Sequence, residues 1–155
     1  MQKILFVCLG NICRSPLAEG IMLHLKQKNN LQLKIDSAGT ANYHVNEAPD
    51  PRTIANAKKN GVDLSALRAR QFQVTDFDGF DKIYVMDKNN LKNVLSLAKD
   101  QKHKEKVSLF LNSVYPGKDL EVPDPYYGNE KEFEDVFQLV YKACELYITN
   151  LHSSN

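Results

Sequence analysis

A cysteine and an arginine near the amino terminus have the spacing of a phosphate-binding loop that contains its own nucleophile. Cys8 follows the apolar residues Ile4–Val7, and Arg14 stands directly before Ser15. A thiol attacks phosphorus usefully as the thiolate, and the N–H groups of a tight loop and of a following helix favour negative charge. The planar fork of Arg14 can bind two phosphate oxygens. These residue types predict attack by a thiolate on a phosphoryl group.

The residues inside this loop agree with that interpretation. Gly10 gives the backbone freedom where a side chain would obstruct a ring of amides, and Asn11 is the other residue type that tolerates a left-handed conformation. Two roles are open for Ser15, because its hydroxyl can cap a helix that begins at Pro16 or can donate to the Cys8 sulfur. The sequence does not decide between them.

The other two cysteines differ in what they predict. Cys13 packs beneath the loop as a small side chain, or it forms a reversible disulfide with Cys8 that protects the nucleophile from over-oxidation. Cys144 belongs to the apolar stripe of a helix near the carboxyl terminus, which predicts a place in the core.

A second group of chemically useful residues lies far along the chain. Asp124 stands between Pro123 and Pro125 and is followed by Tyr126 and Tyr127. The leaving group of a phosphate monoester needs a proton, which a carboxyl group can supply. By itself this segment is typical of a surface turn. Together with the first loop it predicts a general acid beside a flat, aromatic-walled slot.

The elements that must position these residues alternate between strand and helix. Apolar runs predict strands over residues 3–7, 32–37, 80–86 and 107–111. Spacings of three and four predict helices over residues 16–28, from 51 to about 61, around 91–98 and over 133–151. Such alternation indicates a mostly parallel sheet with helices on both faces. Ligand-binding loops then gather at the carboxyl ends of the strands.

Length and composition indicate one domain over residues 1–155. The formal net charge is +1, so no overall field favours nucleic acid or an anionic membrane. No apolar run reaches membrane-spanning length, and the apolar start is too short for a signal peptide. Three cysteines, an odd number, argue against a disulfide framework and for a reducing compartment. We therefore expect a cytoplasmic protein.

The histidines do not predict a metal site. They are scattered, without ligand spacing to each other or to the cysteines: His24, His44, His103 and His152. We expect a surface role for His44 near the rim of the site and a solvated loop over residues 102–104.

The two segments together resemble the low-molecular-weight protein tyrosine phosphatase family. The nucleophile loop of the family corresponds to Cys8–Ser15, and its general-acid loop corresponds to Asp124–Tyr127. Further likeness lies at residues 36–40, 49–52, 68–71 and 86–87, in the order of the family and over nearly the whole chain.

This resemblance implies an α/β fold, the phosphotyrosine protein phosphatase I-like fold, with a four-stranded parallel sheet. It implies Cys8 as the nucleophile, Arg14 as the transition-state clamp and Asp124 as the acid that later activates water. Ser37 is implied to support the loop through Asn11. The implied phosphate-binding and slot residues are Leu9, Gly10, Asn11, Ile12, Cys13, Ser15, Tyr43, Tyr126 and Tyr127. The resemblance implies no metal or organic cofactor. We expect a phosphotyrosine protein or peptide and a tyrosine kinase as partners, and a monomer or weak dimer.

One position departs from the family pattern. Many members carry a histidine just before the Arg-Ala-Arg-Gln segment, where this chain has Leu67. We expect altered rigidity of the phosphate loop rather than lost chemistry. Asp36 and Asp87 are fallback acids, but we expect Asp36 to end a strand and Asp87 to cap the helix after it.

Three alternative functions were weighed. Arsenate reduction needs a relay of cysteines, and this chain has none between Cys13 and Cys144. Related protein-arginine phosphatases have a threonine where this chain has Ile12, an apolar residue that suits a phenyl ring. A non-catalytic phosphotyrosine binder or exopolysaccharide regulator is expected to have lost Cys8 or Asp124. Hydrolysis of phosphotyrosine is therefore the favoured function.

Overall fold

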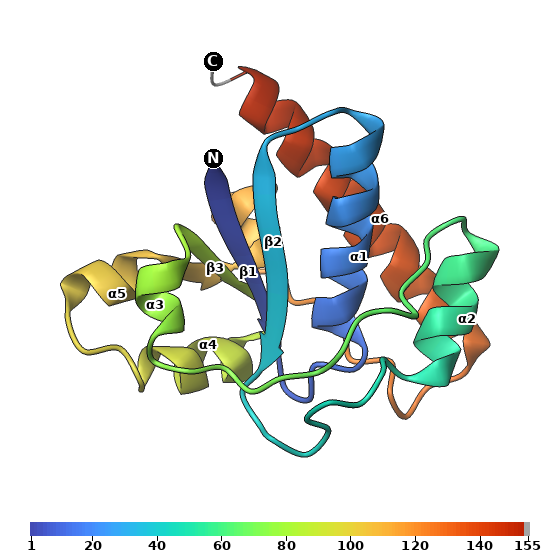
Figure 1. Cartoon of the computed structure of the whole chain (residues 1–155), viewed down its shortest axis with the longest axis horizontal. Coiled ribbons are helices and arrows are strands. Elements are labelled where there is room, and N and C mark those ends of the chain that lie inside the picture. The colour runs from blue at the N-terminus through green and yellow to red at the C-terminus, as the bar shows by residue number, and fades with distance from the viewer. Residues whose placement is uncertain (154–155) are drawn as a thin grey trace.

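The computed structural model describes residues 1–153 and contains one parallel sheet of four strands (Figure 1). The strand order is β2-β1-β3-β4, and neighbouring strands run parallel throughout. The four strands predicted from the sequence are all present, with bounds β1 Gln2–Cys8, β2 Leu33–Gly39, β3 Lys82–Val85 and β4 Val107–Leu109.

Helices cover both faces of this sheet, as the alternation of elements predicts (Figure 1). One face carries α1 (Arg14–Lys28) and the long α6 (Glu130–Ser153), with α2 (Pro51–Lys59) packed against α6. The other face carries α3 (Asp76–Gly79), α4 (Lys88–Leu95) and α5 (Gln101–Glu105). A 3₁₀ turn, Phe110–Ser113, follows β4. The helices α3 and α5 were not predicted, because they are too short to show a helical period.

The central strand β1 is buried from both sides. Ile4 and Phe6 pack into the core beneath α1 and α6, whereas Leu5 and Val7 pack into the core on the opposite face. Burying each of these large side chains contributes roughly 1.5–3 kcal/mol. A continuous apolar run is therefore required here, and it holds the following residue, Cys8, at a fixed place.

The pairing of β1 with β2 brings the end of one strand against the end of the other. Cys8 pairs with Gly39, the last residue of β2. A Cβ atom at Gly39 would lie 2.8 Å from the carbonyl oxygen of Leu9, which is too close for any side chain. Glycine at this position thus allows the loop after β1 to cross close to the end of β2.

The long helix α6 confirms the predicted role of Cys144. This side chain is fully buried in the core that α6 forms with α1, and burial raises the pKa of its thiol far above the usual range. Such a thiol is a core residue without redox exposure.

The prediction of a solvated loop over residues 102–104 was wrong. These residues lie in α5, whose first turn is capped by Asp100. His103 is buried, with its ring stacked on Phe77 at a centroid distance of 4.5 Å, and its Nδ1 accepts from the backbone N–H of Lys99. The prediction failed because the lysines on both sides of His103 are typical of an exposed segment, whereas the histidine ring itself is buried.

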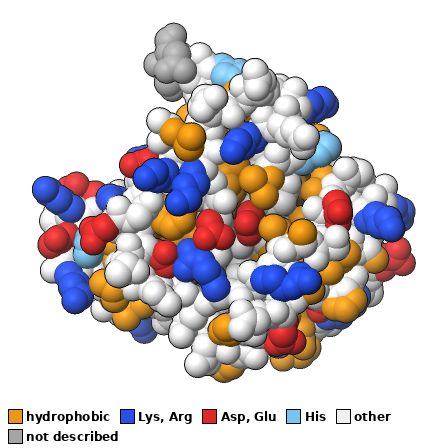
Figure 2. All heavy atoms as spheres, in the orientation of Figure 1, with side chains coloured by type: hydrophobic (Ala, Val, Ile, Leu, Met, Phe, Trp, Pro, Cys, Tyr) orange, Lys and Arg blue, Asp and Glu red, His pale blue; other side chains and the backbone are white. Residues whose placement is uncertain are grey.

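The surface carries charges of both signs. Figure 2 shows Lys and Arg side chains interspersed with Asp and Glu on one face of the molecule, which agrees with the net charge of +1. Within residues 1–153, no helix is both long and apolar enough to span a membrane.

A buried carboxyl group lies between α1 and β2. Glu19 is 9% exposed, and its Oε1 accepts a hydrogen bond of 2.5 Å from the hydroxyl of Ser37. Burial raises the pKa of Glu19 to about 7, while Arg70 opposes and Asp36 reinforces this shift. The folded protein therefore retains a proton on Glu19 at a pH where the unfolded chain has lost it.

This difference predicts how stability changes with pH. The stabilisation that protonated Glu19 gives to the folded state is fully present below about pH 4.5, the pKa of this side chain in the unfolded chain. It is lost as the pH rises through about 7, its pKa in the folded protein. Glu19→Gln keeps an acceptor for Ser37 and cannot ionise. We expect the free energy of unfolding of this variant, relative to the unmodified protein, to increase by about 2 kcal/mol between pH 5 and pH 8.

Urea denaturation at several pH values measures this difference. The matched control is Glu145→Gln, which neutralises an exposed carboxyl group on α6 and should follow the unmodified protein. A constant difference between Glu19→Gln and the unmodified protein across this pH range would contradict the buried, protonated state of Glu19.

Candidate active site

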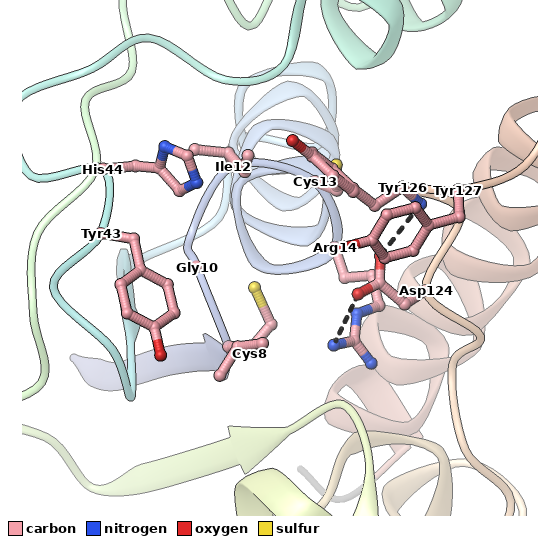
Figure 3. A pocket seen from close by; sticks show the side chains of 11 residues that line it. Cys8, Gly10, Ile12, Cys13, Arg14, Tyr43, His44, Asp124, Tyr126 and Tyr127 are labelled. Atoms are coloured by element: carbon pink, nitrogen blue, oxygen red, sulfur yellow. Dashed lines mark hydrogen bonds and ion pairs between the residues drawn. The ribbon is translucent and has the colours of Figure 1, made fainter.

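The loops at the carboxyl edge of the sheet enclose a cavity of about 230 Å³ (Figure 3). The two loops predicted from the sequence meet there, although they are more than a hundred residues apart. The cavity is lined by Cys8, Leu9, Gly10, Ile12, Cys13, Arg14, Tyr43, His44, Asp124, Tyr126 and Tyr127. The remaining predicted site residues, Asn11, Ser15 and Ser37, are buried directly beneath this lining.

The sulfur of Cys8 lies at the bottom of the cavity, where β1 ends. It is 2.9 Å from the Oγ of Ser15. That oxygen also accepts from the side-chain amide of Asn11 at 2.8 Å, so the hydroxyl proton is available to the sulfur or to the carbonyl oxygen of Ala38, which lies farther away at 3.4 Å. Helix α1 begins at Arg14, with Cys13 at its N-cap and no side-chain cap. Of the two roles open for Ser15, contact with the sulfur is the one present.

Asn11 connects the loop to three neighbouring segments. Its backbone is left-handed, with φ of 58°, as the sequence led us to expect. The side-chain nitrogen donates to Ser15 and to the Oγ of Ser37 at 2.9 Å, and the side-chain oxygen accepts from the backbone N–H of Arg70 at 3.0 Å. Ser37 thus reaches the loop through Asn11.

Leu67 makes no polar contribution to this network. It packs on the apolar core that lies under α1. The brace beyond Ser37 is instead the buried carboxyl of Glu19, which the sequence analysis did not single out. The sequence feature that could have pointed to Glu19 is a charged residue in the middle of the apolar stretch of α1.

Neighbouring segments bind the backbone carbonyl groups of the loop. The carbonyl oxygens of Cys8 and Leu9 accept from the residues that follow β2, and that of Ile12 accepts from the N–H of Asp50 at 2.8 Å. In the part of the chain that the structure describes, no backbone N–H of residues 10–13 has a protein acceptor. A ring of unpaired N–H groups above a helix N-terminus is suited to bind an anion.

Arg14 is held rigidly at the wall of the cavity. Its Nη1 donates to Asp87 at 2.6 Å and to the carbonyl of Val122 at 3.1 Å. Burial disfavours the charge on Arg14, but the Cys8 sulfur and Asp87 outweigh this effect and raise its pKa. The guanidinium is therefore always charged and its orientation is fixed.

Asp87 has a second role besides the predicted one. It caps α4 by accepting from the N–H of Asn90 at 2.8 Å, as expected from the sequence. Its other oxygen binds Arg14, a contact that sequence reasoning missed. The position of Asp87 soon after the third strand could have indicated this contact, because parallel strands end at the same edge of the sheet and Arg14 follows the first strand there. The expectation that Asp36 ends a strand was wrong, because β2 continues to Gly39; Asp36 binds Arg70 from within the strand, and neither fallback acid lines the cavity.

Asp124 lies beside Arg14, across the cavity from Tyr43 and His44 (Figure 3). Its side chain is 43% exposed, and its Oδ2 lies 3.7 Å from Nη2 of Arg14. The Oδ1 accepts from the backbone N–H of Tyr126 at 3.1 Å. The N–H of Val122 donates to the carbonyl of Met86, which fixes the start of this loop on the end of β3.

Aromatic side chains form two sides of the cavity entrance. Tyr43 lies on one side, while Tyr126 and the 96% exposed Tyr127 lie on the other (Figure 3). The two adjacent rings are nearly perpendicular, with centroids 5.0 Å apart. His44 lies above Gly10 and contacts Glu47 through Nδ1 at 2.9 Å. Aromatic rings therefore border the entrance on two sides.

Cys13 belongs to the nucleophile loop and is one of the residues that line the cavity. Burial raises the pKa of its thiol to about 12. Cys13 is therefore a neutral thiol at neutral pH, and Cys8 is the cysteine that contacts a hydroxyl donor and faces the unpaired loop amides.

Comparison with known proteins agrees with this geometry. Residues 3–155 match the family model of low molecular weight phosphotyrosine protein phosphatases. A protein of that name from Schizosaccharomyces pombe is 45% identical over 142 residues, covering 89% of this chain and 90% of the relative. The human protein of that name is 39% identical over 154 residues, covering 97% and 96%.

The fold is also shared with solved structures. A protein tyrosine phosphatase from Entamoeba histolytica superimposes with a TM-score of 0.91 at 38% identity, covering 99% of each chain. The similarity in sequence and in fold extends over nearly the whole chain. The chain therefore belongs to the low molecular weight phosphotyrosine protein phosphatase family and is a protein tyrosine phosphatase.

Proposed function

We propose that Cys8, Arg14 and Asp124 hydrolyse phosphotyrosine in two steps. In the first step the Cys8 thiolate forms a bond to phosphorus, the phosphorus–oxygen bond to tyrosine breaks, and Asp124 gives its proton to the departing oxygen. In the second step the Asp124 carboxylate takes a proton from water, whose oxygen attacks phosphorus as the sulfur–phosphorus bond breaks. The observation that carries this proposal is the convergence of all three side chains on one cavity.

The phosphate is bound by Arg14 and by the backbone of the loop. A guanidinium held by Asp87 needs little reorganisation when the charge on phosphorus spreads over its oxygens. The unpaired N–H groups of residues 10–13 supply further donors. The hydroxyl of Ser15 stabilises the sulfur as a thiolate, both before attack and when it leaves phosphorus. Asn11 and Ser37 keep this loop in shape.

The depth of the cavity favours aryl over alkyl phosphates. Cys8 is buried at the bottom, whereas the tyrosine rings stand at the entrance. A long planar side chain can pass between Tyr43 and Tyr126 and reach the sulfur, but a short serine phosphate cannot. The apolar Ile12 in the wall suits a phenyl ring and disfavours a guanidinium. The proposed substrate is phosphotyrosine in a protein or peptide.

The setting of the reaction follows from this substrate. A tyrosine kinase is the class of enzyme that supplies phosphotyrosine. We further propose that the protein works in the cytoplasm, as a monomer or weak dimer, with residues 1–155 forming one domain. The odd number of cysteines, all three of them free thiols, supports a reducing compartment.

We also propose that Cys13 protects Cys8 from oxidation. Peroxide converts the Cys8 thiolate to a sulfenic acid; the Cys13 sulfur then attacks, forming a disulfide and releasing water. Both sulfurs belong to one short loop that lines one cavity. A thiol reductant returns both cysteines to their active form.

Replacing the nucleophile tests the main proposal. Cys8→Ser should lower turnover of an aryl phosphate at least about 10³-fold, because a serine hydroxyl in this loop stays protonated. Cys144→Ala removes a distant core thiol and should retain activity near that of the unmodified protein. Turnover of Cys8→Ser at the unmodified rate, with circular dichroism showing a folded protein, would exclude the cysteinyl-phosphate step.

The acid is tested with leaving groups of different basicity. Asp124→Ala should lower kcat/KM roughly 10²–10³-fold for phenyl phosphate, because phenolate departs slowly without a proton. The loss should be much smaller for 2,4-dinitrophenyl phosphate, whose leaving group needs no proton. Equal losses with both substrates would show that Asp124 is not the acid.

Mass spectrometry after oxidation tests the protective disulfide. Peroxide should convert the unmodified protein to a Cys8–Cys13 disulfide, and dithiothreitol should restore nearly all activity. The Cys13→Ser variant should instead accumulate sulfinic acid on Cys8 and stay inactive. Equal recovery of the two proteins would contradict the proposed protection.

A further inference from the structure

Arg52 lies between two aromatic rings beside the loop that contains Asp124. Its guanidinium carbon is 5.3 Å from the ring centre of Tyr126 and 4.7 Å from that of Phe133. Phe133 belongs to α6 and is buried, so it forms a fixed base for the guanidinium. Tyr126 closes the other side. Cation–π contacts of this kind hold a ring in a defined place.

The guanidinium is itself anchored by a buried carboxylate. Asp50 accepts from Nε of Arg52 at 3.0 Å and from Nη2 at 2.9 Å, in addition to the backbone N–H of Arg52 at 2.8 Å. These bonds hold the pKa of Asp50 below its usual value. The N–H of Asp50 donates to the carbonyl of Ile12. Arg52 is therefore fixed relative to the phosphate loop.

Arg52 is held by several contacts although its side chain is about half exposed. The side chain is 47% exposed, and a long side chain at such a site ordinarily keeps many rotamers. Here a two-pronged bond to Asp50 and two ring contacts select a single one. The line of contacts starts at the nucleophile loop and ends on Tyr126.

Tyr126 passes this constraint on to the acid. Its backbone N–H is the donor that holds Oδ1 of Asp124. A tight turn, closed by a bond of 2.7 Å from the N–H of Gly128 to the carbonyl of Pro125, joins the ring to the carboxyl group. In such a short turn a displacement of the Tyr126 ring displaces the N–H and with it the carboxyl group.

We propose that Arg52 is a positioning residue for Asp124: by holding the ring of Tyr126, it keeps the Tyr126 N–H on the carboxyl group and the carboxyl group at the leaving oxygen. The inference rests on the proposed role of Asp124 as the acid. Arg52 itself is absent from the lining of the catalytic cavity. We therefore expect Arg52 to act on the two steps in which Asp124 moves a proton.

The decisive measurement is kcat/KM over a series of aryl phosphates that differ in the pKa of the leaving phenol. Arg52→Ala should lower kcat/KM about 10-fold for phenyl phosphate and less than about 2-fold for 2,4-dinitrophenyl phosphate, since a misplaced acid matters only to a basic leaving group. The dependence on leaving-group pKa should thus become steeper. A loss of folded protein or of phosphate binding lowers kcat/KM by the same factor for all substrates. The slope of kcat/KM against leaving-group pKa then stays unchanged.

Lys59→Ala is the matched control. It removes an equally positive side chain from the same helix, α2, where Lys59 is exposed and lies 4.0 Å from the exposed carboxyl group of Glu130. Its slope should equal that of the unmodified protein. If Arg52→Ala does not fold, Tyr126→Leu removes the same ring contact from the other side and should steepen the slope in the same way.

A double variant separates this inference from the proposed function. Adding Arg52→Ala to Asp124→Ala should change kcat/KM for phenyl phosphate less than about 2-fold, because the positioned group is already gone. A further 10-fold loss in the double variant overturns the inference. An unchanged slope in Arg52→Ala overturns it too, and so does a slope in Lys59→Ala that is as steep as in Arg52→Ala. An unchanged slope in Asp124→Ala alone would instead overturn the assignment of the acid.

Discussion

The left-handed turn at Asn11 is the constraint on which the site depends. With φ of 58°, its backbone reverses direction inside the loop, and its side chain bonds to α1, to β2 and to the segment after α2. These bonds, with the outward carbonyl contacts of Cys8, Leu9 and Ile12, leave the N–H groups of the loop free for an anion. The thiolate, the phosphate and the transition state all use that one arrangement of donors.

Two further groups extend this arrangement to the rest of the reaction. Asp87 fixes Arg14 at one wall of the cavity, and the same guanidinium bonds to the carbonyl of Val122 at the start of the acid loop. The acid loop is thus held at its first residue by Arg14. At Tyr126 it is held by Arg52. The nucleophile, the clamp and the acid form one connected unit because each is fixed to the same phosphate loop.

Much of this could be predicted from the sequence, since strand runs, helical periods and the loop at Cys8 are local signals. The four parallel strands, the covering helices and the two loops that meet at the cavity follow from such signals, whereas Tyr43 and Ser37 were expected only from the resemblance to the family. The bond between Arg14 and Asp87 could not be foreseen, because a sequence shows that two side chains share an edge but not that they touch. His103 was misjudged because its lysine neighbours are exposed and its own ring is not. Ser15 was undecided because one hydroxyl serves a helix end or a sulfur equally well.

The contacts of Arg14 also bear on how activity arises during folding. They join residues separated by 73 and 108 positions, so the chain must close long loops before the guanidinium is fixed. Contacts of such high sequence separation form late and slow the folding of a domain. A partly folded chain with only β1, α1 and β2 in place would lack the bonds from Asp50 and Arg70 to the nucleophile loop, as well as the oriented clamp and the acid. Enzymatic activity requires these long-range contacts, and it therefore reports on the intact domain.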